Sequence, residues 1–308
     1  MSSSSTIEFK GRVAIVTGAG NGLGRQHALA LAARGARVLV NDLGSARDGS
    51  GGSAGAAQAV VDEIRAAGGE AIANGASVTD YEAVEAMVRQ AVDAWGRVDI
   101  LVNNAGILRD KSFAKMELAD FRLVLDVHLM GAVHCTKAVW PIMNAQKYGR
   151  IVMTTSSSGL YGNFGQSNYG AAKLALVGLM QTLSIEGAKN DIRVNCLAPT
   201  AATRMTEDLM PAEVLEALKP EAVVPAMLVL AAENAPNRAI LCAGAGTFEA
   251  AHITLTQGAW LGIGADVPEQ LAQRFAEVSE RTGEAVPQSG AAQGSNEVQK
   301  ALANAGRR

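Results

Sequence analysis

The chain has 308 residues, of which 48% are apolar and 19% charged, so it can bury a sizeable core and has the composition of a globular protein. Its formal net charge of −3 at pH 7 gives no reason to expect nucleic acid as a partner. Cys135, Cys196 and Cys242 stand in apolar contexts without metal-ligand or disulfide-framework spacing, so we expect buried thiols in a reducing compartment and no metal site.

Neither the chain ends nor the apolar runs predict targeting or membrane insertion. Residues 1–6 have no basic region or apolar core, and residues 305–308 match no peroxisomal or reticulum-retention ending. The apolar run 223–232 is too short to cross a bilayer and contains Pro225. We therefore expect a cytoplasmic protein that does not bind membranes.

Short β-branched runs alternate with helical stretches from residue 12 to about residue 245. This alternation predicts an α/β fold, a Rossmann-like doubly wound parallel sheet with helices on both faces. The expected strands are 13–17, 37–42, 100–103, 150–155, 192–197 and 239–243. The expected helices are 22–34, 54–67, 81–95, 117–146 and 169–189.

Residues 17–24, Thr-Gly-Ala-Gly-Asn-Gly-Leu-Gly, follow the first expected strand and begin the first expected helix. Glycines let the backbone turn sharply and approach a pyrophosphate, while the helix N-terminus supplies amide donors and a positive dipole end. A tight turn without a ligand is the alternative for such a loop taken alone. The candidate cofactor-binding residues of this loop are Gly18, Asn21, Gly22, Leu23 and Gly24.

Asp42 ends the second expected strand, eighteen residues after Gly24. A carboxylate at this place can accept hydrogen bonds from both hydroxyls of a nucleotide ribose. It would repel a ribose 2′-phosphate, and the nearby cation, Arg47, lies in the glycine- and serine-rich loop 44–55. The sequence therefore predicts NAD rather than NADP as the cofactor.

The run Asn103-Asn104-Ala105-Gly106 follows the strand expected at 100–103. Its small residues allow a close backbone approach beside a nicotinamide ribose, which makes Asn104, Ala105 and Gly106 candidate cofactor contacts. The alternative is structural, with the amides of Asn103 and Asn104 joining neighbouring strands. Both alternatives stay open from the sequence.

Ser156, Tyr169 and Lys173 form the candidate acid/base site. Tyr169 and Lys173 are one helical turn apart and share a helix face, and Ser156 follows the strand expected at 150–155. A tyrosine with an ordinary pKa near 10 is a poor base at neutral pH. A nearby Lys173 ammonium and a positive nicotinamide ring would favour the phenolate and lower that pKa. The alternative for Tyr169 is an amphipathic-helix residue at an interface.

The composition and the hydrophobic pattern of the sequence change near its end. We expect a catalytic domain over 1–265 and a C-terminal extension over 266–308. Residues 266–281 can form an amphipathic helix, while 282–308 are polar and rich in Gln, Ala and Gly. This last segment is expected to be partly disordered or to contact a partner subunit.

Together, the loop 17–24, the run 103–106 and the Ser156, Tyr169 and Lys173 set resemble the short-chain dehydrogenase/reductase family over residues 10–245. The resemblance implies hydride transfer, with Tyr169 as the acid/base. It implies that Lys173 also bonds the nicotinamide ribose and that Ser156 holds the substrate oxygen. A homodimer or homotetramer, associating through the helices 117–146 and 169–189, is implied as well.

The chain departs from the common family pattern at three places. His128 stands where many members have a fourth catalytic residue, an asparagine; it either holds a water leading to Lys173 or is satisfied by a backbone carbonyl. Thr200 follows Pro199 where glycine is frequent, and the resemblance places both at the nicotinamide. Val78 stands near the expected adenine position, where an aspartate is common, so its backbone would make that contact.

A narrower resemblance is to the dehydrogenase part of peroxisomal multifunctional enzymes of type 2, without their hydratase and sterol-carrier portions. That part is a (3R)-hydroxyacyl-CoA dehydrogenase, also described as a 17β-hydroxysteroid dehydrogenase, and a free-standing relative of bacterial type is expected. The residues that carry this resemblance are 40–44, 106–113, 148–151, 161–166, 198–199, 204–206 and 218–220.

Three functions remain open from the sequence. The first is a (3R)-3-hydroxyacyl-CoA dehydrogenase, and the second a dehydrogenase of free hydroxysteroids or other small secondary alcohols. The third is a non-catalytic NAD-binding scaffold. The segments 107–113, 160–164 and 201–218 frame the substrate side, and their apolar content suits an acyl chain or a sterol. The basic residues that could meet coenzyme A phosphates are Arg109, Lys111, Arg204 and Lys219, although surface charges are usually only solvated.

Overall fold

A computed structural model describes residues 6–46, 48–51, 55–202 and 211–305. The chain divides into two compact units, residues 1–250 and 251–308. The boundary expected at 265/266 lies inside the second unit, and the assignment of a catalytic domain to 1–265 stays a prediction. Arg47 and Arg204 lie outside the described residues.

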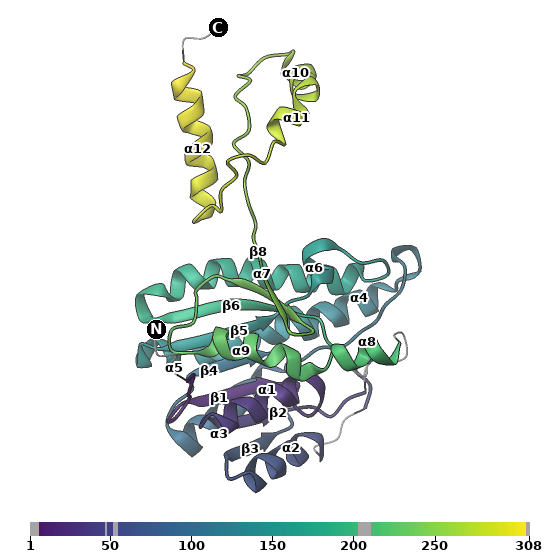
Figure 1. Cartoon of the computed structure of the whole chain (residues 1–308), viewed down its shortest axis with the longest axis vertical. Helices are drawn as coiled ribbons and strands as arrows, with labels where there is room; N and C mark the ends of the chain where they lie inside the picture. The colour runs from purple at the N-terminus through teal and green to yellow at the C-terminus, as the bar shows by residue number, and fades with distance from the viewer. Residues whose placement is uncertain (1–5, 47, 52–54, 203–210, 306–308) are drawn as a thin grey trace. The chain divides into compact units, whose positions relative to one another are not determined.

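The first unit is built on an eight-stranded sheet with the order β3-β2-β1-β4-β5-β6-β7-β8. Every neighbouring pair from β3 to β7 is parallel. The expected doubly wound α/β fold is thereby confirmed, and Figure 1 shows helices on both faces of the sheet. The strands are β1 (Val13–Thr17), β2 (Arg37–Asn41), β3 (Glu70–Asn74), β4 (Ile100–Asn103), β5 (Gly149–Thr154), β6 (Ile192–Pro199), β7 (Ile240–Gly244) and β8 (Thr247–Ala251).

Two layers of helices enclose this sheet. Helix α1 contacts α2 and α9 in one layer, while α3 contacts α5 and α4 contacts α7 in the other. The helices of the first unit are α1 (Gly22–Ala33), α2 (Gly55–Ala66), α3 (Tyr81–Trp95), α4 (Leu118–Leu125), α5 (Gly131–Gln146), α6 (Ser157–Tyr161), α7 (Ser167–Gly187), α8 (Ala212–Ala217) and α9 (Val224–Ala231).

Local sequence explains why the central elements form where they do. All five residues of β1 and all four of β4 are buried, as continuous apolar runs in a parallel sheet covered on both faces require. Helix α3 begins after Asp80, whose side chain accepts a hydrogen bond from the Ala83 amide at 3.1 Å. It ends at Gly96, which takes the left-handed conformation with φ 76°.

The long helix expected over 117–146 is helical from residue 118 to residue 146, but it contains an irregularity that was not expected. The structure has α4, then the π-helical turn η2 (Asp126–Met130), then α5. A π-turn inserts an extra residue into a helix and is frequent at functional sites. Here it carries the buried side chain of His128.

The second unit contains α10 (Val267–Gln273), α11 (Phe275–Val278) and α12 (Gly290–Ala303). The amphipathic helix expected at 266–281 corresponds to α10 and α11, whereas α12 lies in the stretch expected to be polar and partly disordered. The backbones of Leu255 and Ala285 exchange two hydrogen bonds of 2.9 and 3.0 Å. None of the described residues from 251 to 305 is buried, so this unit has no core of its own.

No helix in the described part of the chain is long and apolar enough to cross a membrane. Cys135 and Cys196 are buried free thiols, and Cys242 is half-buried.

Candidate active site

The candidate site lies where the strand order of the sheet reverses. β1 has β2 on one side and β4 on the other, so two crossover connections leave β1 and β4 in opposite directions. Ligands of such sheets bind at the carboxyl ends of the strands at this point. Thr17 ends β1 and Asn103 ends β4, and the two predicted cofactor segments follow directly.

The loop after β1 is shaped by glycines at which a side chain has no room. Gly18 and Gly22 have positive φ of 61° and 53°. A Cβ on Gly18 would lie 2.7 Å from the Cα of Ala105, and one on Gly20 would lie 2.8 Å from Asp42 Oδ2. Asn21 is the extended N-cap residue of α1, with no capping hydrogen bond from its side chain. The loop therefore brings backbone amides of the first turn of α1 close to the end of β4.

Asp42 faces this loop from the end of β2. Its Oδ2 accepts a hydrogen bond from the Gly20 amide at 2.7 Å, and its Oδ1 accepts one from the Gly44 amide at 2.6 Å. Each carboxylate oxygen retains a further acceptor site. The carboxylate is thus fixed in orientation and can still accept two ribose hydroxyls.

Asn104 joins the two strand ends. Its Nδ2 donates to the carbonyl oxygens of Thr17 and Gly18, both at 3.0 Å, and its backbone amide donates to Thr17 Oγ1 at 3.0 Å. The Ala105 amide also donates to Thr17 Oγ1, at 3.1 Å. Asn103 Nδ2 donates to Met153 Sδ on the neighbouring strand β5 at 3.3 Å and to Thr136 Oγ1 on α5 at 3.1 Å. The structural alternative is therefore observed for both asparagines, and Thr17 is a residue that the sequence reasoning missed.

Ser156, Tyr169 and Lys173 come together from two elements. Ser156 caps α6 just after β5, where its Oγ accepts a hydrogen bond from the Ser158 amide at 3.2 Å. Tyr169 and Lys173 lie on α7, and the Ser156 side chain lies close enough to the Tyr169 phenol to lower its pKa. Lys173 Nζ lies 5.4 Å from the centroid of the Tyr169 ring.

Burial dominates the protonation of both helix residues. It lowers the pKa of Lys173 from 10.5 to about 7, and Nζ donates to the carbonyl oxygen of Thr154 at 2.6 Å. Burial raises the pKa of Tyr169, the hydrogen bond from Ser156 lowers it, and the negative charge of Asp110 raises it. Because burial shifts both groups toward their neutral forms, the expected lowering of the Tyr169 pKa by the Lys173 charge stays a prediction.

His128 is held by the backbone after β4. Its Nε2 lies 2.8 Å from the carbonyl oxygen of Ile107 and 3.1 Å from the Ile107 amide nitrogen, and the tautomer decides which bond forms. Its ring meets the Tyr169 ring edge-on, with centroids 5.1 Å apart and planes at 89°. Burial first, and then the charge of Lys173, hold the pKa of His128 well below its usual value. Nε2 of His128 is therefore satisfied by the backbone of Ile107, as one of the two alternatives for this histidine expects.

The remaining predicted contacts occupy the same edge of the sheet. A Cβ on Gly106 would meet the His128 ring, and the Val78 side chain lies against Gly131. The Val78 carbonyl oxygen lies 2.9 Å from His134 Nδ1. Pro199 is the last residue of β6, and the Thr200 amide already donates to the Ala243 carbonyl at 2.8 Å.

On the substrate side, two of the three basic candidates that the structure describes have ion-pair partners. Arg109 donates to the Asp48 carbonyl at 2.8 Å and pairs with Asp120 at 3.2 Å. Lys219 pairs with Glu216. Large apolar side chains are nevertheless exposed in this region, namely Phe113, Leu118, Tyr161 and Phe164.

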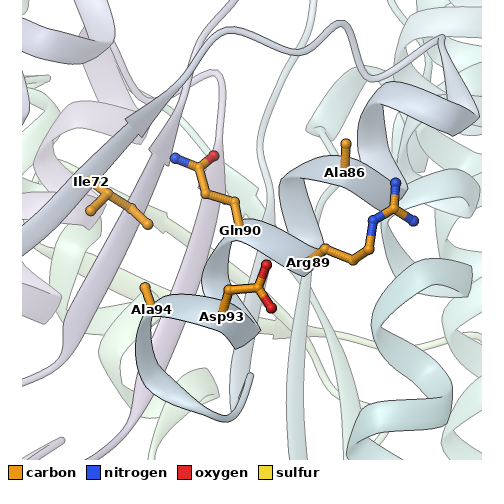
Figure 2. A pocket seen from close by; sticks show the side chains of 6 residues that line it. All are labelled: Ile72, Ala86, Arg89, Gln90, Asp93 and Ala94. Carbon is orange, nitrogen blue, oxygen red and sulfur yellow. The ribbon is translucent and has the colours of Figure 1, made fainter.

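Two hollows differ in their relation to these residues. A surface hollow of about 550 Å³ lies on α3 and the edge strand β3 (Figure 2), and none of the predicted site residues lines it. Its lining residues are Ile72, Ala86, Arg89, Gln90, Asp93 and Ala94.

A buried space of about 10 Å³, close to the room one water needs, is lined by Asn103, His128 and Lys173 among others. Within the described chain, Asn103 Oδ1 and His128 Nδ1 are buried without a hydrogen-bond partner. The described residues contain no His, Cys, Asp or Glu cluster that could hold a metal ion.

Comparison with known proteins gives a consistent result. Residues 12–213 match the short chain dehydrogenase family. The chain is 50% identical to a peroxisomal multifunctional enzyme type 2 of Drosophila melanogaster over 268 residues, which are 87% of this chain and 44% of that enzyme. The structure of that full-length enzyme superposes with a TM-score of 0.79 at 38% identity, over 97% of this chain and 50% of the other.

Two further relatives are matched over nearly their whole length. A short-chain type dehydrogenase/reductase of Mycobacterium tuberculosis is 49% identical over 88% of this chain and 95% of its own. A 7α-hydroxysteroid dehydrogenase, solved in complex with NADH and 7-oxoglycochenodeoxycholic acid, matches with a TM-score of 0.72 at 31% identity, over 80% of this chain and 98% of its own.

The charge of Asp110 provides a direct test of the Tyr169 environment. Asp110→Asn removes a negative charge that disfavours the phenolate, so we expect the pKa of Tyr169 to fall. The measurement is an ultraviolet titration of tyrosine absorbance, with Tyr169→Phe spectra subtracted to isolate this residue. Asp120→Asn is the control, because Asp120 pairs with Arg109 and has no resolved effect on Tyr169. An unchanged Tyr169 pKa in the Asp110 variant would contradict the assignment.

Proposed function

The chain belongs to the short-chain dehydrogenase family, and from this premise we propose that it oxidises (3R)-3-hydroxyacyl-CoA to 3-oxoacyl-CoA with NAD, reversibly. It is an oxidoreductase related to the dehydrogenase domain of the multifunctional enzymes. The observation that carries the proposal is the convergence of Ser156, Tyr169 and Lys173 at the sheet edge where Asp42 and the glycine loop face each other.

The residues at this edge fit a dinucleotide. The loop excludes side chains at Gly18 and Gly20, and the carboxylate of Asp42 is aimed at it with acceptor sites to spare. Gly22, Leu23 and Gly24 would offer the pyrophosphate the helix N-terminus, and Asn104 to Gly106 the nicotinamide side. A bound nicotinamide supplies the hydride acceptor. Asp42 disfavours a 2′-phosphate, which supports NAD over NADP.

The protein's own part in the reaction is to hold the alcohol and move its proton. In the proposed oxidation the Tyr169 phenolate oxygen takes the hydroxyl proton, while Ser156 Oγ donates a hydrogen bond to the same substrate oxygen. The C–H electron pair leaves with the hydride, and the oxygen becomes the ketone oxygen. Lys173 in its charged form stabilises the phenolate, and its Nζ is anchored by the Thr154 carbonyl. Reduction follows the same steps in reverse.

The thioester is proposed as substrate because of the long resemblance to the multifunctional enzymes. The exposed apolar side chains Phe113, Leu118, Tyr161 and Phe164 also suit an acyl chain. A free hydroxysteroid is the second candidate, supported by the likeness to the 7α-hydroxysteroid dehydrogenase. A non-catalytic scaffold would not need Ser156, Tyr169 and Lys173 to converge.

We also propose a homo-oligomer in the cytoplasm. The exposed apolar residues of the second unit, including Phe275, Val298 and Leu302, support self-association through the C-terminal segment in addition to the helices α4, α5 and α7. The buried free thiols support a reducing compartment. Light scattering of the full chain measures its oligomeric state, and fractionation of its source cells shows in which compartment it lies.

The cofactor proposal is tested by Asp42→Arg. The change removes the carboxylate that accepts ribose hydroxyls and places a cation where a 2′-phosphate would lie. We expect the ratio of kcat/KM for NAD to that for NADP to fall by at least tenfold, measured with one alcohol substrate. Asp62→Arg on α2 is the control, because Asp62 is an exposed residue outside the proposed site. An unchanged ratio would contradict the role of Asp42.

The substrate proposal is tested by NADH formation at alkaline pH. Racemic and (3R)-3-hydroxyacyl-CoA of several chain lengths are compared with the corresponding free acids and with a hydroxysteroid panel. We expect the (3R)-thioesters to have the highest kcat/KM, with at least a tenfold loss when coenzyme A is removed. Turnover of free steroids alone would move the function to the second candidate.

A further inference from the structure

The segment after β4 is joined to the start of α7 by three hydrogen bonds at successive residues. The Lys111 amide donates to the Gly165 carbonyl at 3.0 Å. Gln166 Nε2 donates to Asp110 Oδ2 at 2.7 Å. Asn168 Nδ2 donates to the Arg109 carbonyl at 3.0 Å. The loop that continues from Asn104 and Gly106 is thereby fixed to the helix that carries Tyr169.

Asn168 differs from the other two links in its burial and in its second bond. It is 0% exposed, whereas the Gln166 link is exposed. Its Oδ1 accepts a hydrogen bond from the Tyr169 amide at 2.7 Å. That amide lies in the first turn of α7, where backbone N–H groups have no acceptor within the helix. One amide side chain thus connects the backbone of Tyr169 with the carbonyl of Arg109.

The Tyr169 ring is attached to the same segment from its other end. Ile107 contacts His128 Nε2 through its backbone, and the His128 ring contacts the Tyr169 ring edge-on. The backbone of Tyr169 is held through Asn168 and its ring through His128, and both supports lead to residues 107–109. The place of the phenol is therefore defined relative to the loop on the cofactor side.

We propose that Asn168 is a positioning residue that sets the place of the Tyr169 phenol relative to the Asn104–Gly106 loop. It does not touch substrate or cofactor, and its role rests on the proposed function of Tyr169 as acid/base. Its removal leaves the Tyr169 amide and the Arg109 carbonyl without their partner, so the first turn of α7 can shift. A displacement of about 1 Å at a reacting group can cost about 100-fold in rate.

The test compares Asn168→Ala with the wild-type enzyme on the best alcohol substrate. We expect kcat to fall about 10- to 100-fold, a larger primary deuterium isotope effect, and a Kd for NADH within about twofold of wild type. Ser167→Ala is the matched control on the same turn, because the one side-chain hydrogen bond of Ser167 to a described residue is the 3.5 Å contact with Met116 Sδ. We expect its kcat within about twofold of wild type.

Two further measurements keep the inference testable. If Asn168→Ala does not fold, Asn168→Ser replaces it, because serine suits a first helical turn but is too short to reach both partners. If no alcohol is turned over, the proposed function fails. The effect of Asn168→Ala on the Tyr169 pKa is then measured without substrate, by the ultraviolet titration of Tyr169. We then expect the tyrosine pKa to fall toward 10, since loosened packing admits water.

Specific outcomes would overturn the inference. A lower melting temperature with unchanged kcat would assign Asn168 to stability alone. A parallel loss of NADH binding would assign it to the cofactor site. An unchanged Tyr169 titration in the substrate-free measurement would contradict the positioning role in the same way.

Discussion

The candidate site depends on one set of contacts, the hydrogen bonds of Asn104 across the ends of β1 and β4. Parallel strands that neighbour each other at a reversal of strand order leave a gap at their carboxyl ends, because their connections diverge. Asn104 crosses that gap to the carbonyls of Thr17 and Gly18, and Thr17 Oγ1 accepts two amides in return. The glycine loop and the loop toward residues 107–111 thus have one fixed spacing. The remaining predicted site residues are placed by other elements of the same unit, namely Asp42 by the end of β2, Val78 by the segment after β3, His128 by η2, and the others by β5, β6 and α7.

Burial shifts the pKa values of Tyr169 and Lys173 in the direction opposite to the one that the proposed chemistry needs. It raises the pKa of Tyr169 and lowers that of Lys173 to about 7, so both shifts are toward the neutral form. A tyrosine base requires the opposite condition, a positive charge beside the phenol. Lys173 in its charged form supplies part of that charge in the proposed reaction, and a bound oxidised nicotinamide would supply the rest. The account therefore links the acidity of the tyrosine to occupation of the cofactor site rather than to Lys173 alone.

The sequence predicted those parts of the fold that are determined by local signals. β1, α3 and β4 begin and end at the expected residues, because continuous apolar runs and the cap residues Asp80 and Gly96 define them locally. β3 was not among the expected strands, since Glu70-Ala71-Ile72-Ala73-Asn74 contains one β-branched residue. The π-turn at His128 and the two bonds of Asn168 could not be predicted, because both depend on the segment 107–109, distant in sequence. The glycine loop, Asp42 and the Ser156, Tyr169 and Lys173 set were found from spacing, while their pKa values required the burial that only the fold provides.

The central claim is that the Tyr169 phenol is the acid/base of an NAD-dependent oxidation. Its most direct test is the pH dependence of single-turnover NADH formation by the wild-type protein and by Tyr169→Phe, with NADH binding measured for both. The account predicts that the wild-type rate rises through one ionisation and that the variant loses at least about 1000-fold in rate while it still binds NADH. A variant that retains the wild-type rate and pH dependence would contradict it.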